Sequence, residues 1–547
     1  MGSKRGYLAI ILHAHLPFIR HPEYDDFMEE QWLYQAITET YIPLINKFED
    51  LYEDGVDYKL TMTLTPTLLS MLTDNLLQER YLRYLDKSIR LSKEEVKRTK
   101  ENKDFNNLSK YYLNRFKKAK ETFIAYDKDI TNAFKKFSKL GFLKIITCGA
   151  THGYLPLMQE HPEAVKAQIE VAVGLHKRIL GEDPKGIWLP ECAYYKGLDK
   201  ILKEYGIEFF ALDSHGLLYG KPRPEYGVFA PISTESGVAV FGREQKSGRQ
   251  VWSSKVGYPG DYVYREFYRD IGFDLPLDYI GPYIHPDGIR RDTGIKYYKI
   301  TNDNGDLNKK SVYDHKEAKL KAEEHAQHFI DERIIQLKDL EGLIDRNPIF
   351  VAPYDAELFG HWWYEGPEFL DFLIRRLGEE EDLSLVSPLD YLEFYPTNQI
   401  SQPSSSSWGA KGYNDIWLEE SNDWIYPYLH KMAEKMIELA TDISDPSDLN
   451  RRALNQAARE LLLAQSSDWA FIMATGTTVE YARKRVKDHI QNFVHLCQGV
   501  EEDDLDKNFL RELEEKNNIF PYINYKVYSQ KKSPVIVGKG EDISIKG

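Results

Sequence analysis

The sequence predicts an α/β fold in which a mostly parallel sheet or barrel carries a helical insertion and is followed by a separate helical domain. Short apolar runs that end in polar residues alternate with amphipathic stretches, which is typical of buried parallel strands joined by helices. A lysine- and glutamate-rich segment and a late series of amphipathic stretches stand apart from this alternation. At 547 residues, the chain is also too long for one simple core.

The predicted strands and helices follow one another along a barrel domain that we assign to residues 1–400. The run YLAIILHA predicts the first strand, EEQWLYQAITETYIPLINKFEDLYE a helix, and YKLTMTL the second strand. FLKIITC, GIWLP, GIEFFALD and NPIFVAPYD predict further strands, separated by helical stretches such as PEAVKAQIEVAVGLHKRIL. A long helix is expected from His315 to about Asp345, before the last of these strands.

Four segments lie outside this pattern. Residues 74–140 have helical spacing and predict a helical insertion within the barrel domain. Residues 244–314 are rich in Gly, Tyr and charge and too long for a plain connection, so we expect a lid or an ordered excursion that serves packing. After a Ser-, Pro- and Gly-rich linker, residues 401–530 predict a C-terminal helical domain that completes the substrate cleft. Residues 531–547 are expected to form a peripheral tail.

Composition narrows the possible partners and the expected location. The net charge of −15 disfavours nucleic acid and anionic membranes and suits a neutral substrate. The 37 Tyr and 9 Trp residues either stack on sugar rings or fill a large core, and composition does not decide between these readings. Three cysteines at unrelated spacings argue against a disulfide framework or a zinc-finger site. Without a signal-peptide pattern or a run long enough to span a membrane, the expected location is the cytoplasm.

Two carboxylates that end apolar runs are the strongest chemical signal. Glu191 follows GIWLP and Asp355 follows IFVAPY, and both lie among aromatic residues and prolines. Active sites of parallel barrels form where the strands end, so these side chains are expected to meet. Cleavage of a glycosidic bond requires one protonated and one ionised carboxyl group, and an apolar setting raises carboxyl pKa values. A single such carboxylate is more often a helix cap or an ion-pair partner, but the joint pattern favours a glycosidase site.

Five motifs, in order, carry a family resemblance. HAHLPF, GATHGYLPL, WLPECAY, APYDAELFGHWW and AQSSDWAF resemble the five conserved stretches of glycoside hydrolase family 57, over the chain from Tyr7 to about Cys497. The residues of these motifs are most similar to those of the 1,4-α-glucan branching enzymes of that family. Leu16 stands where the family often has Gln, a variant that occurs in branching-enzyme-like members. The resemblance implies an incomplete barrel of seven strands, (β/α)7, an α-glucan substrate, and no metal or organic cofactor.

The resemblance also implies roles for individual residues. Glu191 matches the nucleophile and Asp355 matches the general acid/base. The substrate-binding residues that it implies or places by region are His13, His15, His152, Arg265, Phe273, Trp408, Trp417, Asp468 and Trp469. Of these, Arg265 and Phe273 are placed only because they lie in the expected lid. A lid tyrosine of the branching enzymes matches Tyr258, Tyr262 or Tyr264 by region.

Other functions remain open at this point. An α-amylase or a 4-α-glucanotransferase of the same family would use the same carboxyl pair. His13, His15, His152 and Asp213 could instead form the divalent-metal site of a deacetylase-like hydrolase. An aromatic-rich protein that binds glycans without catalysis is a third possibility. The sequence does not predict the oligomeric state.

Overall fold

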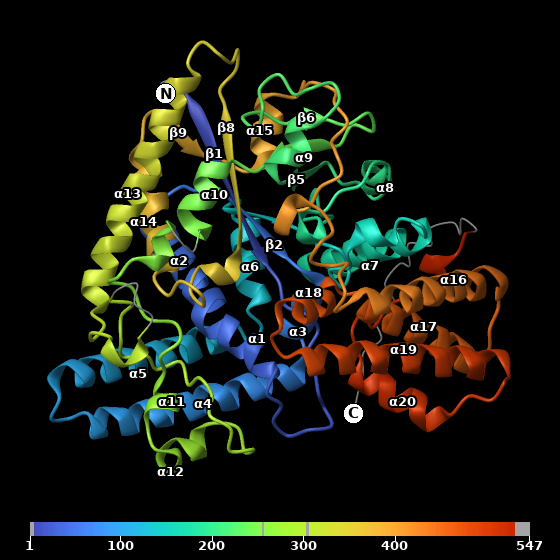
Figure 1. The fold of residues 1–547 in the computed structure, drawn as a ribbon, viewed down its shortest axis with the longest axis horizontal. Helices are drawn as coiled ribbons and strands as arrows, with labels where there is room; N and C mark the ends of the chain where they lie inside the picture. The colour runs from blue at the N-terminus through green and yellow to red at the C-terminus, as the bar shows by residue number, and fades with distance from the viewer. Residues whose placement is uncertain (1–4, 254–255, 302–305, 531–547) are drawn as a thin grey trace.

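The computed structural model describes residues 5–253, 256–301 and 306–530, so the expected tail at 531–547 lies outside the described residues. Strands occupy the centre of the molecule, and helices surround them (Figure 1). The long helices α13 and α14 cover one side, the pair α4 and α5 lies across one end, and helices α16–α20 form a group on the other side (Figure 1).

Seven parallel strands of the described residues form a barrel. In chain order they are β1 (Gly6–Ala14), β2 (Leu60–Leu64), β3 (Leu143–Ile146), β4 (Gly186–Ile187), β5 (Phe209–Leu212), β7 (Ala239–Gly242) and β8 (Ile349–Asp355). They pair in two sheets, β3-β2-β1-β8 and β4-β5-β7. Single parallel bridges from Thr147 to Ile187 and from Arg243 to Val351 join the sheets into a ring. The predicted seven-strand barrel is therefore confirmed, and its two weak seams make the closure incomplete.

Two short strands lie outside the ring. β6 (Ile232–Ser233) pairs antiparallel with β7, and β9 (Leu383–Leu385) pairs parallel with the first residues of β1. β8 pairs with one edge of β1 over residues 7–13, so β9 and β2 share the other edge, at the beginning and the end of β1. The nine residues of β1 thus connect three neighbours and fix the register of the barrel.

Alternating side chains fill the barrel interior and lead directly to the site. The buried interior cluster contains Ala9 and Ile11 of β1 and Ile349 and Val351 of β8. Because side chains alternate along a strand, further inward positions on these strands are His13 and Asp355. Apolar side chains therefore fill the barrel interior, and polar side chains lie at the carboxyl ends of its strands.

Helices pack around this barrel and begin at clear signals. They are α1 (Glu30–Ala36), the π-helix η1 (Ile37–Tyr41), α2 (Ile42–Glu53), α3 (Pro66–Leu72), α7 (Pro162–Leu180), α8 (Leu198–Glu204), α9 (Ser214–Leu218), α10 (Gln245–Trp252), α13 (His315–Leu340), α14 (Gly366–Glu379) and α15 (Pro388–Phe394). Thr65 and Asp314 accept backbone N–H groups as N-caps of α3 and α13. None of the described helices combines the length and apolarity needed to cross a membrane.

The two helical additions have different positions. α4 (Asn75–Arg98), α5 (Lys103–Ala125) and α6 (Thr131–Lys139) interrupt the chain between β2 and β3, and α4 and α5 lie side by side (Figure 1). The C-terminal group comprises α16 (Tyr426–Asp442), α17 (Asp448–Ala464), α18 (Ser467–Thr475), α19 (Val479–Glu501) and α20 (Lys507–Lys516). Arg485 on α19 donates to the backbone oxygen of Phe18 at 3.4 Å, which ties this group to the loop after β1.

The segment 244–314 is an excursion that includes short helices. After α10 it contains η4 (Tyr258–Gly260), α11 (Ile271–Asp274), α12 (Leu277–Ile280), η5 (Gly281–Tyr283) and η6 (Leu307–Lys309). The buried Asp270 carboxylate accepts the backbone N–H groups of Gly272, Thr293 and Gly294 at 2.7–2.9 Å and so organises one turn of the segment. Tyr112 on α5 donates to the backbone oxygen of Lys296 at 2.6 Å. This part of the expected lid is thus packed on the helical insertion.

Candidate active site

The catalytic candidates lie where barrel strands end, and Glu191 and His152 have unusual backbone conformations. His13 is the register partner of Asp355 across β1 and β8. Glu191 lies in a short 3-10 turn after β4 with a φ of 61°, and His152 has a φ of 58°. Left-handed conformations are costly for residues other than glycine, and they persist where the surrounding structure holds them. Here the backbone oxygen of Glu191 accepts the N–H of Trp408 at 3.0 Å.

Hydrogen bonds to both carboxylate oxygens fix the side chain of Glu191. Trp408 donates its indole N–H to Oε2 at 2.9 Å, and Ser467 donates its hydroxyl to Oε1 at 3.0 Å. Burial raises the pKa of Glu191 to about 7, although the bond from Trp408 opposes this rise. The negative charge of Asp468 adds to the rise in pKa. Glu191 is therefore an oriented carboxylate that changes its charge near neutral pH.

Asp355 has the higher pKa of the two carboxyl groups. Burial raises the pKa of Asp355 to about 8, and the carboxylates of Glu357 and Glu191 raise it further, against the opposing charges of His15 and Arg243. At neutral pH this carboxyl therefore carries its proton in a larger fraction of molecules than Glu191 does. A pair of carboxyl groups whose environments separate their pKa values can divide the roles of acid and nucleophile.

Three histidines stack beside this pair. The rings of His15 and His152 are 3.9 Å apart at 14°, and the ring of His13 lies 4.4 Å from Trp188 at 8°. Burial lowers the pKa values of His13 and His152 well below the usual value, and neighbouring imidazoles add to the decrease. Burial also disfavours the charged form of His15, but the Asp468 carboxylate 3.0 Å away outweighs it and raises the pKa. The stack thus holds one cation and two neutral rings.

The hydrogen bonds assign the protons of the two neutral rings. The Glu191 carboxylate accepts the Ser467 hydroxyl proton, so the Ser467 oxygen accepts from Nδ1 of His152 at 2.8 Å. Nε2 of His152 then accepts from Nε2 of His13 at 3.1 Å. A directed chain therefore runs from His13 through His152 and Ser467 to Glu191.

The start of α18 brings the C-terminal helices to the site. Ser466 pairs with Gly153 in a β-bridge, and the N–H of Ser467 donates to the backbone oxygen of His152 at 3.0 Å. Burial disfavours the Asp468 carboxylate, but the charge and hydrogen bond of His15 hold its pKa at about 2. Because Asp468 lies in the first turn of α18, the helix N-terminus also favours its negative charge.

Several residues of the site were not predicted. Glu357 accepts the backbone N–H of His15 at 3.2 Å and the hydroxyl of Tyr41, and it raises the pKa of Asp355. Ser467 lies next to the predicted Asp468, and Glu357 lies two positions after Asp355, so both were within quoted motifs. The contact of Tyr41 with Glu357 had no such signal. Trp188 lies in the quoted motif WLPECAY, but its stacking on His13 joins distant parts of the chain.

The structure places four of the predicted substrate contacts in packing positions or away from the site. Arg265 is 5% exposed, pairs with Glu39 at 3.3 Å and stacks on Tyr364, so it holds the excursion to the barrel helices. Trp417 is 1% exposed, and its ring stacks on Tyr154.

The other two of these residues are Trp469 and Phe273. Trp469 is fully buried, and its indole donates to the backbone oxygen of Leu463 at 2.8 Å. Phe273 is exposed on α11, and none of the contacts found among the described residues joins it to the site. Trp469 is therefore a packing element of α18, and Phe273 lies outside the site.

The three candidate lid tyrosines differ in exposure. Tyr258 and Tyr264 are buried, and their hydroxyls bond to Nδ1 of His328 and His325 on α13 at 2.7 and 2.8 Å. Tyr262 between them is 45% exposed. Exposure leaves Tyr262 as the tyrosine of this set that is accessible to a substrate.

Donor groups that could hold a metal overlap the same histidines. Within the described residues, the donor atoms of His15, His152 and Asp468 lie within 4.8 Å of one another, as do those of His13, Cys148 and His152. Asp213 belongs to neither set; it accepts from Ser214 and lies 3.5 Å from Arg243. The metal set expected from the sequence is therefore not the one that the fold assembles. The ion pair with Asp468 favours the protonated form of His15, and a metal ion bound there would have to displace that proton.

A barrel with two partly buried carboxyl groups at its strand ends, one oriented by hydrogen bonds and both with raised pKa values, is typical of an enzyme that acts on glycosidic bonds. The sequence profile of glycosyl hydrolase family 57 matches residues 9–403, and that of the 1,4-alpha-glucan branching enzyme C-terminal domain matches residues 428–528. The chain belongs to glycoside hydrolase family 57.

Individual relatives cover nearly the whole chain. It is 34% identical to the 1,4-alpha-glucan branching enzyme TK1436 of Thermococcus kodakarensis, over 95% of this chain and 79% of that protein. The crystal structure of the α-amylase AmyC from Thermotoga maritima has a TM-score of 0.91 and 46% identity, covering 97% of this chain and 100% of that chain. A GH57-type branching enzyme from Pyrococcus horikoshii has a TM-score of 0.86 and 32% identity, with 97% and 98% covered.

Proposed function

We propose that this protein is a 1,4-α-glucan branching enzyme, which cleaves α-1,4 bonds of a linear glucan and transfers the freed chain to a glucan 6-hydroxyl. The carboxyl pair carries the proposal, with pKa values of about 7 for Glu191 and about 8 for Asp355. The match of residues 428–528 to the branching-enzyme C-terminal profile supports transfer, and these residues also supply Ser467, which bonds Glu191. The proposed substrates are amylose and glycogen, and the proposed location is the cytoplasm.

In the first half-reaction, Asp355 acts as the acid and Glu191 as the nucleophile. The Asp355 proton moves to the glycosidic oxygen as the bond from that oxygen to the anomeric carbon breaks. A Glu191 oxygen bonds to the same carbon, which gives a covalent glycosyl-enzyme. The hydrogen bonds from Trp408 and Ser467 hold the carboxylate in place for this attack and favour its ionised form.

In the second half-reaction, Asp355 acts as the base. It accepts the proton of a glucan 6-hydroxyl as that oxygen attacks the anomeric carbon and the bond to Glu191 breaks. The product is an α-1,6 branch, because two inversions restore the starting configuration. A water molecule in place of the hydroxyl would give hydrolysis, so exclusion of water decides the outcome.

The ion pair of His15 and Asp468 supports this site electrostatically. The imidazolium of His15 lowers the pKa values of both Glu191 and Asp355, which limits how far burial raises them. In the proposed mechanism, its charge faces the reacting sugar from the barrel side, while Asp468 keeps it protonated.

An α-amylase is the second candidate function. It is favoured by the 46% identity to a protein named as an α-amylase, which exceeds the identity to the branching enzymes described above. Both candidates use Glu191 and Asp355 in the same roles. They differ in whether the region around Tyr262 keeps water away from the glycosyl-enzyme while an acceptor chain binds.

Proton NMR of linear amylose before and after incubation separates the two candidates. We expect the α-1,6 anomeric signal to grow while few new reducing ends form. New reducing ends without an α-1,6 signal would contradict branching and establish hydrolysis. The same assay with a strong chelator tests the metal-dependent alternative, since the proposed mechanism predicts unchanged activity.

A further inference from the structure

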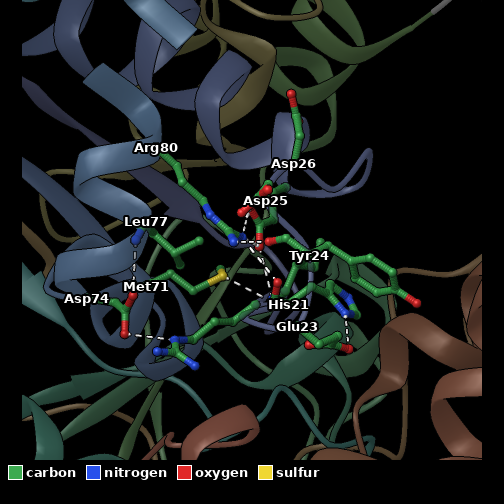
Figure 2. A network of polar contacts seen from close by, with 12 residues as sticks. His21, Glu23, Tyr24, Asp25, Asp26, Met71, Asp74, Leu77 and Arg80 are labelled. Atoms are coloured by element: carbon green, nitrogen blue, oxygen red, sulfur yellow. Dashed lines mark hydrogen bonds and ion pairs between the residues drawn. The ribbon is translucent and has the colours of Figure 1, made fainter. Parts of the chain in front are cut away.

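A second cavity lies away from the catalytic carboxyls. It has a volume of about 660 Å³, counting its opening to solvent, and lies between α1, α4 and the segment 283–293. Its walls include Asp25, Gln31, Arg80, Arg83, Tyr283 and Arg291. Figure 2 shows Arg80 reaching from α4 toward Tyr24, Asp25 and Asp26 in the loop that follows β1.

Two arginines in the wall of this cavity carry hydrogen-bond donors that have no partner among the described residues. Arg80 is 6% exposed, and its Nη1 donates to both oxygens of Glu30 at 2.6 and 2.8 Å. Its Nε has no partner among the described residues, and neither do Nε and Nη1 of Arg291, which is 8% exposed. Buried guanidinium N–H groups without acceptors are costly, and in the wall of a cavity they favour a ligand that supplies oxygen atoms.

The charge of the lining indicates a neutral ligand. Four acidic side chains (Asp25, Asp26, Glu30 and Asp292) oppose four basic ones (Arg80, Arg83, Lys87 and Arg291), so the formal charge is zero. An anion such as phosphate would meet as many carboxylates as cations there. Tyr34, Tyr84 and Tyr283 add aromatic surface to the wall. Alternating donors, acceptors and aromatic surface suit a ligand with many hydroxyl groups.

We propose that this cavity is a second glucan-binding site, which holds a glucosyl residue of the polysaccharide outside the reaction centre. The proposal rests on the α-glucan substrate proposed above and names a new place where that substrate binds. The loop that begins at His15 also supplies Asp25 and Asp26, so a chain bound in the cavity lies at the far end of a loop that starts in the active site. Two attachment points would favour long glucans over short ones.

Calorimetric titration of the full-length Glu191→Gln variant with maltoheptaose tests the proposal, because this variant does not consume the ligand. We expect two classes of sites. Asp25→Ala with Arg83→Ala, added to Glu191→Gln, removes one acceptor and one donor from the cavity. This change should weaken one class about tenfold or more and leave the other unchanged. The matched control is Asp86→Ala with Arg90→Ala on α4, whose side chains are exposed and do not line the cavity.

Each outcome bears on a different claim. A single class of sites in the parent, or equal binding by the cavity variant and its control, would overturn the second site. If the Glu191→Gln variant does not bind maltoheptaose at all, the α-glucan substrate on which the proposal rests is rejected. A hydrolytic result in the NMR assay would leave the cavity proposal standing, since an amylase binds the same chains.

Discussion

His13 and Asp355 lie side by side as register partners on adjacent parallel strands, β1 and β8. Both follow the inward side chains that fill the barrel, so the same pairing that closes the apolar core also delivers a neutral imidazole and a carboxyl to its mouth. The site is therefore an extension of the barrel packing, and its acid depends on that packing for its raised pKa.

Replacement of Glu191 by Gln should lower kcat by about 10⁴-fold or more, because the amide cannot form the glycosyl-enzyme. Branching of amylose measures the loss, and calorimetry with maltoheptaose checks that binding persists. Asp355→Ala serves as the complementary variant: with an activated glycosyl fluoride donor it should still accumulate a glycosyl-enzyme. Mass spectrometry should place the added mass on the peptide that contains Glu191, and its appearance elsewhere would reject this residue as nucleophile.

The pH dependence of kcat/KM should be bell-shaped, with limbs governed by the coupled pair near pH 7 and 8. The acidic limb reports the ionisation of Glu191, and the alkaline limb reports loss of the Asp355 proton. Glu357→Gln removes a negative charge that raises the pKa of Asp355, so the alkaline limb should move to lower pH. The matched control is Glu368→Gln on the exterior helix α14, which should leave both limbs in place.

Trp408→Phe tests the orientation of the nucleophile. The change removes the N–H group that bonds Oε2 of Glu191 at 2.9 Å and keeps an aromatic ring against Trp188. Since that bond lowers the pKa of Glu191, the acidic limb should move to higher pH. We expect kcat to fall about tenfold at neutral pH, in line with loss of one hydrogen bond to a charged group. An unchanged acidic limb would show that the bond does not favour the carboxylate.

Asp355→Asn should stabilise the protein at alkaline pH while it abolishes activity. The carboxyl has a pKa of 3.8 when unfolded and about 8 when folded, so between these values only the unfolded state ionises. The stability that the group contributes is therefore present at low pH and lost as the pH rises through about 8. The amide does not titrate, so the Tm of the variant should exceed that of the parent by an amount that grows from pH 4 to pH 8. Parallel Tm curves would contradict the raised pKa.

Arg265→Met should destabilise the fold more than it affects substrate binding. It leaves Glu39 buried beside its remaining partner His361, and loss of one partner of a buried ion pair costs about 3–5 kcal/mol. Denaturant unfolding measures this change, and KM for amylose should stay near the parent value. Arg269→Met, which breaks the more exposed pair with Asp274, is the control and should cost at most about 1 kcal/mol. A large rise in KM with normal stability would restore Arg265 to the substrate contacts.

The amino-acid sequence alone was sufficient to predict the fold class and the positions of Glu191 and Asp355 after strands. A buried parallel strand must be apolar throughout its length, and polar residues that follow it must lie at its end. This constraint is local, so it marked His13, Glu191 and Asp355 correctly as strand-end residues. The first four family motifs were readable for the same reason, since each lies at a strand end and the turn after it, whereas the fifth lies at the junction of α17 and α18.

The contacts of the other side chains that lie near the two carboxyl groups could be identified from the tertiary structure but not from the sequence. His15 and Asp468 are 453 positions apart, and Ser467 and Glu191 are 276 apart, so no local pattern records these contacts. Trp469 belongs to a motif and Trp417 was placed by the family resemblance, yet their rings lie in packed layers. The pKa values follow the same division: the sequence supplies the carboxyls, but their burial and neighbouring charges set when each holds a proton. Burial is a property of the assembled chain, because it depends on what packs against each residue from the rest of the fold.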